Sequence, residues 1–230
     1  MNDRNYQKEL ESLIGVSDNR GKRLLLHSCC APCSSYVLTY LSSFFDITVF
    51  YYNPNITDQK EYLHRVAEQK RLIENLNSDG FVPEWSAVDA ERIPIKFIEG
   101  EHDTDSFYEA AKGLEGAPEG GSRCERCFYL RLKKTGELAL REGFDFFTTT
   151  LTISPLKNAK LINSVGEAVA AKLNERAADV MRPDDKIDDN ALMWMPSDFK
   201  KKGGYARSIE LSAKYDLYRQ NYCGCEFSMR

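Results

Sequence analysis

Long apolar runs and secretion signals are missing from this sequence. No segment approaches the roughly 18 uninterrupted apolar residues that cross a membrane. Residues 1–15 are polar and amphipathic, and they contain no apolar core of a secretory signal. We therefore expect a cytoplasmic protein that does not span a membrane.

Two families of catalytic motif are missing as well. The chain has no Walker-type phosphate loop and no evident Ser/His/Asp arrangement, and it contains only 3 histidines. His27 lies beside a group of cysteines, where it is a candidate for a catalytic or supporting role. A satisfied core histidine explains it equally well, and His64 and His102 suggest no role.

The chain also lacks an excess of positive charge. Its net charge of −4 argues against an indiscriminate DNA-binding protein, which is usually basic overall, but leaves room for a local basic patch that binds structured RNA. With 230 residues, of which 42% are hydrophobic, the chain suits one globular domain over residues 1–230.

The sequence alternates short β-rich segments with amphipathic helical segments. This alternation predicts an α/β fold in which a parallel sheet is joined by crossover helices. In such folds ligands bind beyond the carboxyl ends of the strands. The expected strands are residues 23–28, 47–56, 80–88 and 144–155, and the expected helices are residues 33–45, 58–77, 103–114, 124–143 and 158–174. The acidic stretch 184–190 is expected to be a solvated turn, because it lacks the glycine and distal glutamate of a calcium loop.

The distribution of the 7 cysteines is the most unusual feature. A cytosolic chain is not expected to depend on structural disulfides. Buried structural cysteines are usually scattered, whereas metal-binding and redox cysteines cluster. Here they form three groups, which are Cys29, Cys30 and Cys33, then Cys124 and Cys127, and finally Cys223 and Cys225.

Thiolates from the first two groups could hold one inorganic centre. Cys124 and Cys127 have C-x-x-C spacing at an expected helix start, so both can face one point. Four thiolates from two loops suit a closed zinc site or an iron–sulfur cluster. The adjacent pair Cys29 and Cys30 is awkward for tetrahedral zinc, whereas a larger cluster accepts neighbours on different irons. A structural zinc with spare thiols stays open as an alternative.

Cys223 and Cys225 flank a glycine, so the chain can bend sharply between them. A disulfide over so short a loop is strained and easily reduced. The pair therefore suits a redox-active disulfide or two ligands of an extra metal.

A basic stretch, residues 196–208, combines three lysines with a diglycine that is expected to be flexible and with an aromatic residue. That combination suits phosphate contact with base stacking, although a lysine run is more often a solvated face. Asp198, just before it, is a candidate acid or metal-facing carboxylate. The candidate RNA-contacting residues are Lys200, Lys201, Lys202, Tyr205 and Arg207.

Six segments of the chain together resemble the QueH family of epoxyqueuosine reductases. They are "HSCCAPC", "YYNPNI", "RCERCFYLRL", "TTTLTISPLKN", "PSDFKKKGGYARSIELS" and "YRQNYCGC". The resemblance runs in order from about residue 24 to the C-terminus. Residues 1–20 lie outside it as an N-terminal extension, and residues 175–193 match weakly.

The resemblance implies the last step of queuosine synthesis on tRNA, in which the epoxide oxygen of epoxyqueuosine at the anticodon wobble position is removed. It implies a Rossmann-like fold related to the adenine nucleotide α-hydrolases, with a helical, cysteine-bearing C-terminal region. On this basis we expect a single catalytic domain with a loop at 115–123 and a C-terminal region, 196–230, that carries the basic stretch and the Cys-Gly-Cys pair.

The resemblance also implies the cofactor. Cys29, Cys30, Cys124 and Cys127 match the family's cysteines and are expected to bind a [4Fe-4S] cluster. Some relatives carry Asp at the position of Cys33, so Cys33 is expected to bind an additional iron ion. Cys223 and Cys225 match the C-terminal C-G-C, expected to act as a redox pair or as iron ligands.

The expected reaction is a two-electron deoxygenation with electrons from an external donor. A metal with an open position would act on the epoxide oxygen, and His27, Asp198 or water would supply the proton. Two rivals remain, a tRNA thiolation enzyme that uses an iron–sulfur cluster and a zinc-stabilised RNA-binding module. The thiolation enzymes bind ATP through a Ser-Gly-Gly-type loop after the first strand, where this chain has "HSCCAPC".

Overall fold

The computed structural model describes residues 4–79, 93–180 and 191–229. Within these residues the chain forms one five-stranded sheet, in which all neighbouring strands are parallel and the order is β3-β2-β1-β4-β5. The predicted α/β fold with a parallel sheet is therefore confirmed. The strands are β1 (Arg23–His27), β2 (Asp46–Tyr51), β3 (Lys96–Glu99), β4 (Phe146–Thr149) and β5 (Met193–Trp194).

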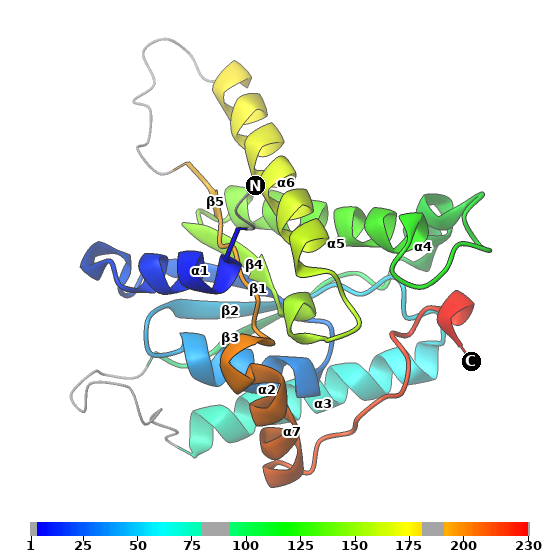
Figure 1. Cartoon of the computed structure of the whole chain (residues 1–230), viewed down its shortest axis with the longest axis horizontal. Coiled ribbons are helices and arrows are strands. Elements are labelled where there is room, and N and C mark those ends of the chain that lie inside the picture. Colours follow the sequence, from blue (N-terminus) through cyan, green and yellow to red (C-terminus); the bar gives the residue numbers. More distant parts are fainter. Residues whose placement is uncertain (1–3, 80–92, 181–190, 230) are drawn as a thin grey trace.

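Helices cover both faces of the sheet (Figure 1). One layer contains α2, α3 and α7, and the other contains α5 and α6. The α-helices are α1 (Tyr6–Ile14), α2 (Ala31–Leu41), α3 (Gln59–Ser78), α4 (Thr104–Ala111), α5 (Ser122–Arg141), α6 (Ala159–Val180) and α7 (Gly204–Lys214). Short 3-10 helices follow at η1 (Ser17–Asn19), η2 (Thr150–Ile153), η3 (Lys201–Gly203) and η4 (Glu226–Ser228).

Strand β1 contributes to both hydrophobic layers because successive strand side chains point to opposite faces. Leu24 and Leu26 pack in the cluster that contains α2, α3 and α7, whereas Leu25 packs with α5 and α6. All three leucines are fully buried. This explains why β1 reads as a continuous apolar run and not as an alternating one.

The chain turns to opposite faces after β1 and after β4, which are neighbouring strands. β1 leads into α2 on one face, and β4 leads through η2 into α6 on the other. Such a topological switch point leaves a crevice beyond the carboxyl ends of the two strands. The first cysteine group lies directly there, at residues 29–33.

Most predicted elements are confirmed, with small shifts at their ends. α3 begins after Asp58, whose side chain accepts a hydrogen bond from the Glu61 N–H, and α4 begins after Asp103 in the same way. The expected strand at 80–88 and the expected turn at 184–190 lie outside the described residues. Among the described residues the third strand in chain order is β3, which the sequence did not predict.

The predicted β-rich segment 144–155 is partly wrong. Only four of its residues form β4, and η2 follows at once. The Thr149 hydroxyl accepts a hydrogen bond from the Leu151 N–H at 3.2 Å, which turns the chain out of the strand. The change of direction brings Thr150 to the strand-end crevice.

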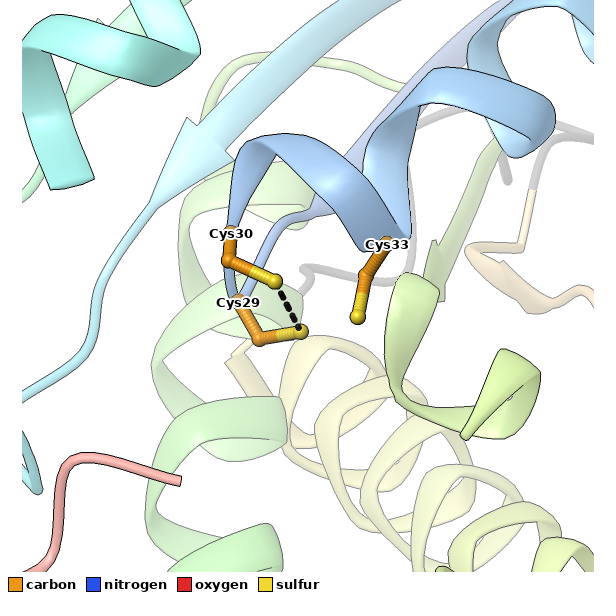
Figure 2. A group of neighbouring side chains, drawn as sticks. All are labelled: Cys29, Cys30 and Cys33. Atoms are coloured by element: carbon orange, nitrogen blue, oxygen red, sulfur yellow. Dashed lines mark hydrogen bonds between the residues drawn. The ribbon is translucent and has the colours of Figure 1, made fainter. Parts of the chain in front are cut away.

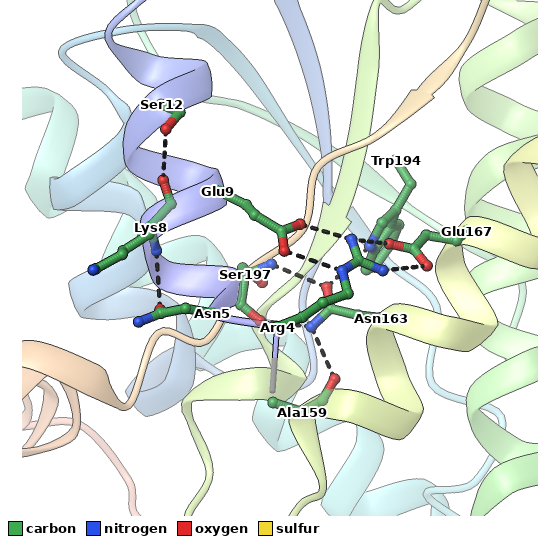
Figure 3. A network of polar contacts seen from close by, with 10 residues as sticks. All are labelled: Arg4, Asn5, Lys8, Glu9, Ser12, Ala159, Asn163, Glu167, Trp194 and Ser197. Carbon is green, nitrogen blue, oxygen red and sulfur yellow. Dashed lines mark hydrogen bonds and ion pairs between the residues drawn. The ribbon is translucent and has the colours of Figure 1, made fainter. Parts of the chain in front are cut away.

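The N-terminal helix is tied to the rest of the fold by polar contacts (Figure 3). The Arg4 guanidinium forms ion pairs with Glu9 at 2.7 Å and with Glu167 of α6 at 2.8 Å. Next to this contact, Asn163 of α6 accepts hydrogen bonds from Trp194 Nε1 and from the Ser197 N–H, both at 3.0 Å. Strand β5 and the segment after it are thereby attached to α6.

The diglycine was expected to be flexible. The structure shows instead that Gly203 is needed for its backbone conformation and Gly204 for close packing. Gly203 has φ +79° where α7 begins. A Cβ on Gly204 would lie 2.6 Å from Cε1 of Tyr36, so a side chain there would separate α7 from α2. The two glycines therefore allow close packing.

No helix in the described part of the chain is long and apolar enough to cross a membrane.

Candidate metal centre and active-site pocket

The three cysteines after β1 converge on one point (Figure 2). Cys30 is the N-cap of α2 and Cys33 lies in its first turn, so the two side chains are three positions apart and share a helix face. Cys29 precedes them. The three Sγ atoms lie within 4.8 Å of one another, and those of Cys29 and Cys30 are 3.8 Å apart.

Buried hydroxyl groups hold this loop in place. The Thr150 hydroxyl accepts a hydrogen bond from the Cys29 N–H at 3.2 Å and donates one to Cys29 Sγ at 3.4 Å. On the other side, the Ser28 and Ser34 hydroxyls both donate to Oε1 of Gln69, at 2.6 and 2.8 Å. The loop is thus preorganised by η2 and α3 together.

The three thiols share one negative charge. Hydrogen bonds from Cys30 and Cys33 lower the pKa of Cys29 well below its usual range. The same contact with Cys29 raises the pKa of Cys30 to about 12 and that of Cys33 well above its usual range. One thiolate that accepts hydrogen bonds from two thiols is therefore the stable metal-free arrangement, and a bound cation would favour ionisation of the other two.

The remaining four cysteines line one pocket. Cys124 and Cys127 lie in the first two turns of α5, and Cys223 and Cys225 reach the pocket from the C-terminal tail. The Gly120 N–H donates a hydrogen bond to Cys124 Sγ at 3.2 Å. The structure thus brings the second and third cysteine groups to a common cavity.

The tail cysteines are held by the segment after β2. The Asn55 amide donates a hydrogen bond to the Cys223 carbonyl at 3.1 Å, and the Thr57 N–H donates to the Gly224 carbonyl at 3.2 Å. The Arg65 guanidinium of α3 also donates to the Cys223 carbonyl, at 3.3 Å. Gly224 has φ +100°, and a Cβ there would lie 2.6 Å from Ile56 Cγ1. Only glycine fits this bend.

The expected disulfide between the tail cysteines is not present. All seven cysteines lie within the described residues and all are free thiols. A hydrogen bond from Cys225 lowers the pKa of Cys223 to about 5, and the same contact raises the pKa of Cys225 well above its usual range. The reduced pair is therefore one thiolate and one thiol, the form from which a disulfide can be made.

Two cationic side chains that the sequence reasoning missed lie among the thiols. Lys157 is half-buried on the pocket wall. Burial opposes its charge, but the nearby thiolates of Cys29 and Cys223 outweigh this effect and raise the pKa of Lys157. The amine is thus near both the strand-end and the tail cysteines.

Arg131 of α5 is the second cation, and it is 3% exposed. It donates hydrogen bonds to Oδ1 of Asn53 at 2.5 Å and to Nε2 of His27 at 3.3 Å, and its Nη1 lies 4.0 Å from Cys127 Sγ. The signal available in the sequence was spacing, because Arg131 follows Cys127 by one helical turn. Arg131 and Lys157 both lie inside segments that carry the resemblance.

The predicted proton donors do not fit that role. His27 is fully buried, with Nδ1 2.7 Å from the Thr149 hydroxyl. Burial and the charge of Arg131 lower the pKa of His27 to about 3, so the ring is neutral near pH 7. Asp198 is buried and paired with Lys200 at 2.6 Å, and it is not among the residues that line the pocket.

The basic stretch is largely neutralised by acidic partners. Besides Lys200, which pairs with Asp198, Lys202 pairs with Glu11 at 2.5 Å and Arg207 pairs with Glu210 at 2.6 Å. Lys201 is exposed and has no acidic partner among the described residues, and Tyr205 is 36% exposed. RNA contact by this stretch stays a prediction.

Several known proteins that are similar to this chain carry the same family name. The family described as "Epoxyqueuosine reductase QueH" matches residues 24–230. The chain belongs to the QueH family. A Staphylococcus epidermidis protein named epoxyqueuosine reductase QueH is 39% identical over 228 residues, which is 97% of this chain and 84% of that protein. Proteins of the same name from Streptococcus pyogenes and Thermotoga maritima are 37% and 32% identical, covering 98% and 90% of this chain.

The thiols of this QueH chain could hold a metal centre. The donors are soft sulfur atoms at the carboxyl end of a buried strand, and Cys29, Cys30 and Cys33 are already close enough to share a metal. Arg131 and Lys157 place positive charge beside them, which favours an anionic occupant. The chemistry of the donor set also suits zinc, so the identity of the metal is argued from function below.

Proposed function

We propose that the chain, an epoxyqueuosine reductase by family, reduces epoxyqueuosine to queuosine at the wobble position of tRNA anticodons. The observation that carries the proposal is that three thiols meet at the sheet's switch point and four more line a pocket, with Lys157 near both groups, in a chain that matches QueH proteins over nearly all its length. Removal of the epoxide oxygen as water takes two electrons and two protons. The reaction therefore needs a redox-active group, and cysteine thiols can bind or form one.

We further propose the [4Fe-4S] cluster and its ligands. Cys29, Cys30, Cys124 and Cys127 would hold it, and when bound the cluster would supply electrons one at a time from an external donor. Two features support this set. Cys29 and Cys30 occupy the strand end, and Cys124 and Cys127 are on the first turns of a helix that packs against β1. Cys33 would bind an additional iron ion.

Cys223 and Cys225 would bind iron or cycle between dithiol and disulfide. The contrast between their pKa values supports cycling, because Cys223 is the attacking thiolate and Cys225 holds the proton. Their position on the pocket wall with Cys124 and Cys127 would allow exchange of electrons over a short distance.

The pocket walls would bind the modified base. Phe107 and Phe128 supply apolar surface, and Lys157 supplies a hydrogen-bond donor for the epoxide oxygen. The buried Asn55 donates to the tail but leaves its Oδ1 without a hydrogen-bond partner, so this oxygen is an acceptor for a substrate hydroxyl. To reach these groups the wobble base must leave the anticodon stack.

Binding of the rest of the tRNA would use exposed cations and aromatics outside the pocket. We assign this role to the basic stretch, in which Lys201 has no acidic partner among the described residues and Tyr205 offers a partly exposed ring. The mild negative charge of the whole chain would confine RNA to that face and disfavour DNA in general.

A genetic complementation experiment tests the proposal. The gene is deleted in a host with no other epoxyqueuosine reductase, and the nucleosides of its tRNA are analysed by mass spectrometry. We expect epoxyqueuosine to accumulate and queuosine to return when the intact gene is restored. Queuosine that persists in the deletion strain would overturn the proposed function.

Colour, metal content and ATP binding distinguish the proposed reductase from the two alternative functions, the tRNA thiolation enzyme and the zinc-stabilised RNA-binding module. Protein purified without oxygen should be brown and contain iron and acid-labile sulfide, whereas a zinc-stabilised RNA-binding module would be colourless. The thiolation alternative predicts ATP binding at the strand end, where Cys29 and Cys30 stand, and equilibrium dialysis with ATP measures it directly. Binding of ATP there would favour the thiolation enzyme.

A further inference from the structure

Arg131 is a buried cation without a carboxylate partner among the described residues. Its side chain is 3% exposed, and its hydrogen bonds go to an amide oxygen of Asn53 and a neutral ring nitrogen of His27. An arginine side chain stays protonated in a protein. A buried charge that no carboxylate pairs with is costly, so the fold must gain something by keeping it.

The other deeply buried arginines show how this chain normally satisfies such a group. Arg65 is 2% exposed and forms an ion pair with Glu61 at 2.7 Å. Arg123 is also 2% exposed, and Nη1 donates to the carbonyls of Glu115 and Ala117, each at 2.6 Å. Among the described residues Arg131 hydrogen-bonds neither a carboxylate nor a backbone carbonyl, and its third partner, besides Asn53 and His27, is Cys127 Sγ at 4.0 Å.

We propose that Arg131 is the counter-charge of an anionic iron–sulfur centre held by Cys127 and its neighbours, and that Arg131 sets the reduction potential of this centre. The inference rests on the cluster of the proposed function and concerns a positioning residue that does not touch the substrate. The guanidinium is held by Asn53 and His27 on one side, which leaves Nη1 directed to the ligand sulfur of Cys127.

The sign of the effect follows from charge. Reduction adds an electron to the centre, so a nearby positive charge stabilises the reduced form more than the oxidised form. Removing that charge must therefore move the midpoint potential to a more negative value. Lys157 provides a second charge beside Cys29, Cys33 and Cys223, but it is half-buried, so solvent screens it more and its removal must shift the potential less.

The experiment is a redox titration of the anaerobically reconstituted full-length protein, followed by EPR and visible absorbance. The variants are R131Q, which removes the charge, and R131K, which keeps it but loses the planar fork. The matched control is R126Q, because Arg126 lies on the same helix beside Cys127 but is exposed. We expect the potential to fall most in R131Q, less in R131K, and least in R126Q.

Two results would overturn the inference, namely an R131Q potential equal to that of the wild-type protein, or an equal shift in R131Q and R126Q. If R131Q folds by circular dichroism but binds no iron while R131K does, the charge is needed for assembly and the inference stands. If R131Q does not fold, the reduction potential of K157Q is measured in its place. An unchanged potential in K157Q would contradict the inference that nearby positive charge sets the potential of the centre. The redox titration does not depend on the nucleoside analysis that tests the proposed function. A negative titration result would therefore contradict the role of Arg131 and leave the proposed reductase function standing.

Discussion

The strand-end cysteines and the tail cysteines show two ways of placing thiols at one site. Cys29, Cys30 and Cys33 are positioned by a strand end and the first turn of α2, which are continuous in sequence. Cys223 and Cys225 belong to an irregular stretch of the tail directly before η4, and side chains from distant elements hold it. The first group is part of the sheet architecture, and the second is attached to it.

This difference matches the roles proposed for the two groups. A centre that transfers electrons benefits from ligands that move little, and the strand end provides them. A dithiol pair that opens and closes must change its geometry in each cycle, and a tail held by a few hydrogen bonds can do so. The following predictions test whether the two groups differ in this way.

The largest expected effect comes from replacing one cysteine in each of the two groups. We expect C30A to lose bound iron, brown colour and all measurable reductase activity, because the strand end then lacks one of its thiolates. In contrast, C225A should retain most of its iron and colour while losing turnover on tRNA. Iron analysis, absorbance and single-turnover assays measure the two results.

The control for this pair is S42A, at the other end of α2, which should retain both iron and activity. Equal iron loss in C30A and C225A would show that the two groups form one cofactor site, and the comparison would then be wrong.

A smaller effect is expected when the tail is loosened from the sheet. G224A places a Cβ at φ +100° and 2.6 Å from Ile56 Cγ1, so the tail should shift at a local cost on the order of 1–3 kcal/mol. Cys225, now 5% exposed, should then react faster with iodoacetamide in the iron-free protein. Peptide mass spectrometry measures the rate.

G113A is the matched control, because Gly113 also has positive φ, at +75°, but its Cβ would meet nothing within 4 Å. It should leave the reactivity of Cys225 unchanged. The same acceleration in both variants would attribute the effect to backbone strain in general and not to the contact with Ile56.

The tail pair should also show a distinct pH dependence. The pKa of Cys223 is lowered to about 5 by its hydrogen bond from Cys225, so Cys223 is a thiolate at neutral pH. In iron-free protein its alkylation rate should stay nearly constant from pH 7 to 9 and fall only as the pH drops through about 5. Cys225, whose pKa is raised, should react slowly throughout this range. Equal rates for the two thiols at pH 7 would contradict this assignment.

The smallest expected effect concerns RNA contact away from both groups. K201Q should weaken tRNA binding modestly and reduce the slope of log affinity against log salt by about 1, as expected for the loss of one phosphate contact. Filter binding at several salt concentrations measures it, with exposed Lys8 of α1 as the control in K8Q. A slope unchanged in K201Q would remove the basic stretch from the RNA-binding surface.

Much of the first group could be predicted from local sequence. The apolar run of β1, followed by small residues and Pro32 within the first turn of α2, is a strand–loop–helix pattern with local causes. Cys30 and Cys33 share a face because of helical spacing. The expected pairing of Cys29 and Cys30 with Cys124 and Cys127 as ligands stays a prediction, because it depends on segments that lie far apart in the sequence.

The sequence could not predict what surrounds these thiols. β3 and β5 were missed because they are only four and two residues long and depend on pairing with β2 and β4. Arg131 was missed because an arginine on a helix is usually exposed, and its burial follows from the close packing of α5 over β1.

By itself, the sequence determined the alternation of strands and helices, the three cysteine groups and the family. These features depend on neighbouring residues, on hydrophobic periodicity and on motifs that can be read along the chain. Tertiary structure alone decided that the tail cysteines enter the pocket of Cys124 and Cys127, that His27 is buried and neutral, and that Arg131 is buried against Asn53 and His27. Burial and charge at these positions arise from segments that lie far apart in the chain, and only folding brings those segments into contact.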